Sequence, residues 1–221
     1  MPKVSEEYKL NKKKMIADVA YELCLEKTVS TVTMQDIINR TGLSQGGIYR
    51  FYRDIDEIFA QMIVQVRDSV NIKDKVDLIF DSADAMTTEE VITHVFEMLA
   101  DFMTEELMGL EKLDFELSVL AMNAPERVEK ILDGAKGVGH KEYIIARTAE
   151  YFKKKMQQGE LNMRVSGMEL LTYISSVYAG IQMNCIVNNC YKKGPMSGFY
   201  QPKMQIRTLA KTVNFLLGVE R

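Results

Sequence analysis

The stretch that decides the fold runs from Thr33 to Tyr52 and reads TMQDIINRTGLSQGGIYRFY. Thr33 followed by Asp36 at the third position after it is the pattern of a capping box, which predicts the start of a helix. Gly42 can adopt the left-handed backbone conformation that ends such a helix, and Ser44 can cap a second one. Two short helices joined by a glycine turn are typical of a helix-turn-helix, whose second helix enters the major groove of DNA.

The second of these helices carries two glycines, Gly46 and Gly47, in its first turn. Each glycine in a helix costs about 1 kcal/mol relative to alanine. That cost is explained if a bulky surface must come close to the helix backbone, and the phosphate ridge of duplex DNA is such a surface. The glycines therefore favour a helix that contacts DNA.

The charge of the chain is unevenly distributed. Of the 221 residues, 47% are hydrophobic and 27% are charged, and the net charge is -3, as in an ordinary soluble globular protein. Residues 1–53 hold nine Lys/Arg and six Asp/Glu, a balance of +3, whereas the remaining residues have a balance of -6. A small basic segment attached to a larger acidic one indicates that the N-terminal part meets a polyanion.

Several classes of protein find no support in the sequence. Cys24, Cys185 and Cys190 form neither a disulfide framework nor a zinc motif, and the two histidines are far apart, so we expect no metal and no cofactor. No P-loop, HExxH motif or nucleophile elbow occurs, so we do not expect an enzyme. We find no apolar N-terminal signal and no apolar run of roughly 18 residues, so we expect no membrane contact and a cytoplasmic protein.

Apolar residues recur at helical spacing along the chain, and no segment shows the alternation of a strand. The sequence therefore predicts an all-α protein. We expect a three-helix helix-turn-helix domain at residues 1–53, a helix at 54–70 that connects it to the rest, and a larger helical C-terminal domain, so that the second domain covers 54–221. The helices predicted in that domain lie at 54–70, 88–107, 110–122, 125–132, 141–158, 166–189 and 203–217.

Residues 9–59 resemble the DNA-binding domain of the TetR family of bacterial transcriptional regulators. The spacing T-x3-I-x4-G-x-S-x-G-x2-Y-x2-Y, followed by Ile58, carries the resemblance. Its residues are Thr33, Ile37, Gly42, Ser44, Gly46, Tyr49 and Tyr52. The family usually has Phe in place of Tyr52. Over the remaining residues the resemblance is one of architecture, and it implies a C-terminal domain that binds an effector and dimerises.

Three positions depart from the family pattern. The family commonly has a glycine at Thr28, a phosphate-binding lysine at Ile55, and a His or Tyr that reaches a phosphate at Phe51. The sequence therefore predicts weaker or differently placed contacts with the DNA backbone. Arg53, two residues before Ile55, can compensate for the missing lysine.

The resemblance implies DNA contacts for a set of residues that are polar, basic or small: Thr33, Ser44, Gln45, Gly46, Gly47, Tyr49, Arg50, Arg53 and Lys13. Helix N-termini favour phosphates, Gln can pair with adenine, and Arg can pair with guanine or a phosphate. Tyr49 would position the helix on a phosphate without reading sequence. The alternatives are a core role for Tyr49 and Tyr52, and a solvated surface for the polar residues, including the lysines at 12–14.

One helix-turn-helix reads few base pairs, so such proteins usually act as dimers on palindromic sites. The resemblance implies a four-helix bundle built from the last two predicted helices of each copy. The candidate interface residues are small or apolar: Ser176, Gly180, Ile206, Leu209, Val213 and Leu216. The alternative is that the apolar stripes close the core of a single chain, and the sequence does not separate the two.

The C-terminal domain is rich in methionine and aromatic residues, which suit an irregular apolar ligand but also fill ordinary cores. The candidate pocket residues are Met98, Phe102, Phe115, Met122, Tyr143, Tyr173 and Tyr178. We therefore expect a repressor that binds palindromic double-stranded DNA as a homodimer and is released by a small, largely apolar effector. The alternative is a helical adaptor or small-molecule-binding protein without sequence-specific DNA binding.

Overall fold

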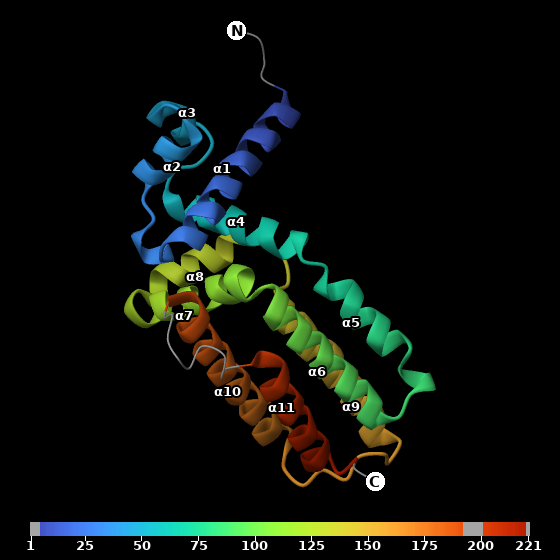
Figure 1. The fold of residues 1–221 in the computed structure, drawn as a ribbon. Helices are drawn as coiled ribbons and strands as arrows, with labels where there is room; N and C mark the ends of the chain where they lie inside the picture. Colours follow the sequence, from blue (N-terminus) through green and yellow to red (C-terminus); the bar gives the residue numbers. More distant parts are fainter. Residues whose placement is uncertain (1–4, 192–200, 220–221) are drawn as a thin grey trace. The chain divides into compact units, whose positions relative to one another are not determined.

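The computed structural model describes residues 5–191 and 201–219. Within these ranges the protein consists of helices and turns without a β-strand, which confirms the all-α prediction. The helices pack into two compact units. Of the described residues, the first unit contains 5–70 and 113–138, and the second contains 71–112, 139–191 and 201–219. Figure 1 shows the course of the chain from helix to helix.

The first unit contains the predicted helix-turn-helix. Its elements are α1 (Glu6–Glu26), a 3-10 turn (Val29–Thr31), α2 (Met34–Thr41), α3 (Gln45–Tyr49), α4 (Ile55–Ser69), α7 (Lys112–Asn123, from its second residue on) and α8 (Pro125–Gly134). α1 packs against α2 and α4. Ile16, Ile37, Ile48 and Phe59 come from the first four helices and are fully buried. Each of these helices therefore turns an apolar face toward the interior.

Two ion pairs attach α8 to the beginning of α4. Lys130 Nζ lies 2.8 Å from Oδ2 of Asp54, the residue that caps α4. Arg127 Nε donates to Asp56 Oδ1 at 2.8 Å, and this pair is more shielded from solvent. The predicted connecting helix is thus held at its N-terminus by a helix from the second half of the sequence.

The close approach of α8 to α4 also depends on a glycine. A Cβ built on Gly134 would lie only 2.9 Å from the Cβ of Ala60, which is shorter than real contacts of this kind.

The two compact units do not divide at residue 53, where we placed the end of the DNA-binding domain. That boundary concerns function, and it stays a prediction.

The second unit is a helical bundle. Its elements are α5 (Ile72–Asp81), a 3-10 turn (Ala83–Ala85), α6 (Thr88–Glu105), a π-helical turn (Leu107–Glu111), α9 (His140–Gln157), α10 (Gly167–Ile186), a second π-helical turn (Val187–Tyr191) and α11 (Pro202–Leu217). α11 packs on α6 and α10, and α5 packs on α6 and α9. Helix α5 is absent from the predicted helices. It is short, and the side chain of Asn71 caps it.

The core of the second unit corrects one part of the predicted dimer interface. Ile206, Leu209 and Val213 on α11 are at most 2% exposed, and they pack with buried residues of α6 and α10 such as Phe96 and Leu170. Their side chains therefore close the core of the single chain, which was the alternative that the sequence left open. Leu216 is partly buried against the same cluster.

Candidate nucleic-acid interface

Local hydrogen bonds fix the turn between α2 and α3. The predicted capping box is present: the Thr33 hydroxyl accepts from the Asp36 N–H at 3.2 Å, and Asp36 Oδ2 accepts from the Thr33 N–H at 2.8 Å. Gly42 has a φ of 67°, in the left-handed region that ends α2. Ser44 Oγ accepts from the Gly47 N–H at 3.1 Å and starts α3. The helix-turn-helix therefore follows from short-range sequence signals.

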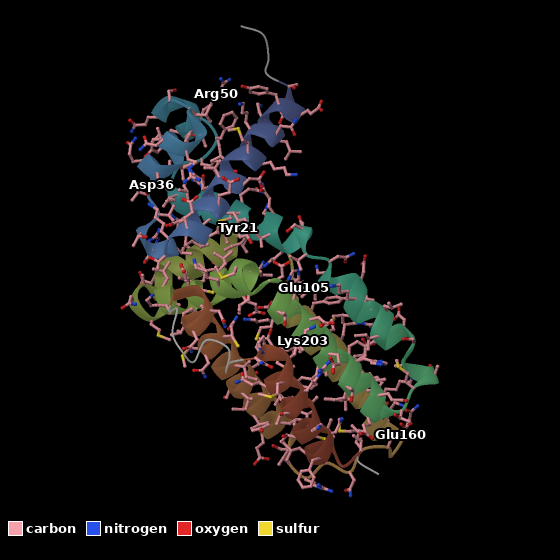
Figure 2. All side chains as sticks on the ribbon, in the orientation of Figure 1. Tyr21, Asp36, Arg50, Glu105, Glu160 and Lys203 are labelled. Atoms are coloured by element: carbon pink, nitrogen blue, oxygen red, sulfur yellow. The ribbon has the colours of Figure 1, made fainter. Side chains whose placement is uncertain are left out.

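Helix α3 buries one residue and exposes its polar ones. Ile48 is fully buried, whereas Gln45, Gly46 and Arg50 are exposed. Figure 2 shows Arg50 at the outer end of the helix-turn-helix. A side chain can pair with a base edge only if solvent reaches it in the free protein, and both predicted base-reading residues meet this requirement. Their contacts with DNA stay predictions.

The two glycines of α3 have different surroundings. A Cβ on Gly46 would meet no heavy atom within 4 Å, so the fold itself does not need a glycine there. A Cβ on Gly47 would lie 3.2 Å from Ser44 Oγ, so that the hydroxyl would have to shift by a few tenths of an ångström. Gly46 is therefore the position at which an approaching partner best explains the glycine.

The two tyrosines that follow have separate roles. Tyr49 is 45% exposed, so its ring can reach a partner. Tyr52 is only 4% exposed, and its hydroxyl donates to the main-chain oxygen of Lys13 at 2.9 Å. Burial raises the pKa of the Tyr52 hydroxyl well above its usual value. Tyr52 is therefore a core residue that joins α1 to the end of the helix-turn-helix, which was the alternative considered for it.

Most of the basic residues around α3 already have a partner within the unit. Arg40 donates to both carboxylate oxygens of Glu26, at 3.0 and 2.7 Å, and Arg53 is paired with Glu57. The Lys13 ammonium group lies 5.5 Å from the centre of the Tyr52 ring. The electrostatic potential that this surface offers to DNA is therefore weaker than the count of basic residues indicates.

The capping acid Asp36 is part of the same electrostatic pattern. Lys27 Nζ lies 2.6 Å from Asp36 Oδ2, and the Thr33 hydroxyl donates to the same oxygen at 2.6 Å. Hydrogen bonds from Lys27 and then from Thr33 lower the pKa of Asp36 to about 2. The carboxylate that starts α2 is therefore charged at neutral pH, and Figure 2 places it beside that helix.

A two-helix motif with a buried inner face and an exposed, glycine-headed second helix defines a helix-turn-helix DNA-binding protein. Residues 16–62 match the family described as bacterial regulatory proteins, tetR family. The match contains α2, α3, the second half of α1 and the first half of α4.

Comparison of the whole chain finds one similar regulator and several similar folds. The chain is 23% identical over 216 residues to an uncharacterized HTH-type transcriptional regulator of Bacillus subtilis, YfiR, and the alignment covers 94% of this chain and 96% of that protein. Its fold is similar to that of a protein from Mesorhizobium loti assigned to the TetR family, with a TM-score of 0.64, 16% identity, and coverage of 94% and 96%. Salmonella enterica GusR has a TM-score of 0.63, 14% identity, and coverage of 97% and 98%. Residues 16–62 thus carry a DNA-binding domain of the tetR family, and the whole chain is similar to an HTH-type transcriptional regulator.

The predicted effector residues are divided between the two units. Phe115 and Met122 lie in the first unit, and Met122 is 81% exposed. In the second unit, the Tyr143 hydroxyl donates to Asp77 Oδ1 at 2.6 Å on α5, and Tyr173 is exposed on α10. Met122 and Tyr173 are therefore unlike the enclosed pocket residues that we expected.

The remaining three candidates lie deeper in the second unit. Met98 is partly buried, and Phe102 is 8% exposed, with its ring edge-on to His140 at 6.5 Å. The Tyr178 hydroxyl donates to Glu111 Oε1 at 2.7 Å. Their role in binding an effector stays a prediction.

Sequence reasoning missed the most deeply buried acid of the second unit. Glu111 is 1% exposed, ends the π-helical turn, and accepts hydrogen bonds from Tyr178 and from the amide of Gln182. It lies in a run of mixed charged and apolar residues, where nothing distinguishes it from a surface acid. The signal that identifies it is the pairing with α10, which only the folded chain brings about.

Helix α10 corrects the expectation that no segment is long and apolar enough for a membrane. The segment Gly167–Cys190 has a mean hydropathy of 1.3 over 18 residues, of which 28% are buried, and so could cross a bilayer by length and composition. One helix of this kind is weak evidence for a membrane protein. Within the described part of the chain, no three His, Cys, Asp or Glu side chains lie together in a way that could hold a metal ion.

Proposed function

We propose that this TetR-family regulator binds palindromic operator DNA as a cytoplasmic homodimer, represses transcription, and is released by a small, largely apolar effector. Residues 1–53 would bind DNA, and residues 54–221 would dimerise and bind the effector. The observation that carries DNA binding is the exposure of Gln45, Gly46 and Arg50 on a helix whose inner residue, Ile48, is fully buried. Thr33, Ser44, Gly47, Tyr49 and Lys13 would position that helix on phosphates, as would Arg53 in competition with its ion pair to Glu57.

The dimer proposal rests on the outer face of α10. Met168 and Met183 are 73% and 47% exposed, and Ser176 and Gly180 lie between them. Residues spaced by three or four positions share one face of a helix. That face lies opposite Leu170, which is buried in the core.

An apolar face of this length is costly to leave in water, and a second copy of the same helix would cover it. A Cβ on Gly180 would meet nothing within 4 Å, so the single chain leaves room there for the close approach of another helix. Ser176, Gly180 and Leu216 therefore remain interface candidates. The three α11 residues buried in the core do not.

The effector proposal rests on the interior of the second unit. Tyr178 packs against the main apolar cluster of this unit and donates to Glu111, Phe102 is buried beside His140, and Met98 is partly buried. An apolar effector that binds one arrangement of the chain better than another would shift the protein toward that arrangement. Only this difference in affinity can release the DNA.

Binding to duplex DNA at two salt concentrations tests the function against the helical-adaptor alternative. A regulator binds duplexes selected from random sequence, and binds more weakly at the higher salt because phosphate contacts release counterions. A folded sample without affinity for any duplex in dilute buffer would overturn the proposal. Sedimentation of the same sample determines whether the binding species is a dimer, and a reporter gene under the selected operator distinguishes repression from activation.

Two substitutions on α3 test which of its side chains contacts phosphate and which one reads a base. Tyr49→Phe should weaken binding to all duplexes by a similar factor, because a phosphate contact carries no sequence information. Gln45→Ala should change the preferred base at one position of each half-site, with a discrimination of about 1–3 kcal/mol lost there. Selection of preferred duplexes with each variant measures both effects. Equal loss of preference from the two substitutions would contradict the assignment.

A further inference from the structure

We propose that Glu57 is a positioning residue that limits DNA affinity by holding Arg53 away from the phosphate backbone. This inference rests on the proposed DNA-binding function. Arg53 lies between α3 and α4, and its side chain is 89% exposed. A guanidinium group so open to solvent would be free to bind a phosphate, yet here it is held within the chain.

Glu57 engages Arg53 through both of its carboxylate oxygens. Oε1 accepts from Arg53 Nε at 2.5 Å and lies 2.5 Å from Arg53 Nη2, while Oε2 accepts from the Arg53 main-chain N–H at 2.8 Å. The main-chain hydrogen bond, followed by the side-chain one, lowers the pKa of Glu57. The carboxylate is therefore charged at neutral pH and is anchored at the beginning of α4.

The other acids at this point of the chain have partners elsewhere. Asp54 is paired with Lys130, and Asp56 with Arg127, both from α8. Glu57 therefore acts on Arg53 without sharing its charge with those two basic residues. Because Ile55 is apolar, Arg53 is the basic residue that the sequence provides at the start of α4.

A DNA phosphate must either displace Glu57 from the guanidinium group or share the group with a nearby negative charge. Exposed ion pairs are weak, so displacement is feasible but reduces the net gain from the phosphate contact. Glu57 would thus set the affinity without preventing binding. Removal of its charge should strengthen binding by roughly two- to five-fold for each helix-turn-helix.

The test uses the full chain with Glu57→Gln, which removes the charge and keeps an oxygen to accept from the Arg53 N–H. The matched control is Glu26→Gln, because Glu26 binds Arg40 through two hydrogen bonds on the same unit and its substitution changes the net charge equally. Fluorescence anisotropy with a selected duplex at several salt concentrations gives the affinity and its salt dependence.

We expect Glu57→Gln to bind more tightly than Glu26→Gln and to steepen the dependence of log K on log salt by about 0.9 for each released arginine. The gain should vanish when Arg53→Ala is added, so the double-mutant cycle shows coupling between the two residues. Equal affinities of the Gln variants, or a gain that persists without Arg53, would overturn the inference. So would weaker binding by Glu57→Gln, because Glu57 would then orient Arg53 toward the phosphate.

Two further measurements keep the outcomes separate. If thermal unfolding shows that Glu57→Gln does not fold, the DNA affinity of Arg53→Ala alone tests the inference. An arginine withheld by Glu57 contributes little, so its loss should weaken binding by less than two-fold, and any larger loss would contradict the inference. Failure of the unaltered protein to bind any duplex would instead overturn the proposed function itself.

Discussion

Replacement of Gly46 by alanine should make the protein more stable and a weaker DNA binder. Gly46 is the second residue of α3, and a Cβ at this position meets no heavy atom within 4 Å. The substitution therefore adds no clash within the chain. It reduces the conformational freedom of the unfolded state, and we expect it to stabilise the fold by about 0.5–1 kcal/mol. For a chain of this size, that gain corresponds to a rise of about 1–4 °C in Tm.

The same methyl group would weaken DNA binding if the phosphate backbone lies against α3. Inserting a methyl group into a close-packed contact typically costs about 1–3 kcal/mol. Because 1.4 kcal/mol is a tenfold change in Kd, we expect binding to weaken by roughly five- to 150-fold for each helix-turn-helix. Stability and DNA affinity should thus move in opposite directions, which a general loss of folding cannot produce.

Differential scanning calorimetry and fluorescence anisotropy at one fixed salt concentration measure the two effects. Gly167→Ala is the matched control, because Gly167 begins α10 and a Cβ there also meets nothing within 4 Å. It should raise Tm without changing Kd. If Gly46→Ala is more stable and binds DNA as tightly as the unaltered protein, the DNA backbone does not lie close against α3 at this position. That result would refute the explanation given for Gly46.

Two further predictions concern the first unit. Lys27 and Thr33 lower the pKa of Asp36 to about 2 from an ordinary value of 3.8, so the carboxylate stabilises the fold fully above about pH 4 and loses this effect as the pH falls through about 2. Urea unfolding between pH 5 and 2 should therefore show a steeper loss of stability in the unaltered protein than in Asp36→Asn, and equal slopes would contradict the assignment. Gly134→Ala should destabilise the protein by about 1–3 kcal/mol, because its Cβ would lie 2.9 Å from that of Ala60. Chemical unfolding measures this loss, and an unchanged free energy of unfolding would show that α8 does not pack on α4 as described.

Much of the helix-turn-helix could be predicted because its determinants are local. The Thr33–Asp36 capping box, the left-handed conformation of Gly42 and the cap at Ser44 each involve residues a few positions apart, and all three are present. The outward position of Gln45 follows from the same periodicity. Such features depend on backbone geometry within one or two helical turns, which a short sequence specifies.

Helix α5 and the partners of Glu111 could not be predicted in this way. Helix α5 has only ten residues, which is too short for a helix to be stable by itself, and packing on α6 and α9 stabilises it. Glu111 becomes a buried hydrogen-bond acceptor only because Tyr178 and Gln182 come to it from 67 and 71 positions further along the chain. A local pattern carries no information about contacts over such separations.

The sequence by itself determined the class of protein, because helix caps, glycine placement and charge distribution act over short distances and identify a helix-turn-helix with an exposed second helix. The tertiary structure decided which apolar helix faces are buried within the chain and which stay exposed to solvent. Ile206, Leu209 and Val213 are covered by α6 and α10, whereas Met168 and Met183 on α10 stay exposed. The physical reason is that helical periodicity specifies an apolar face, but only the packing of distant segments specifies what covers that face.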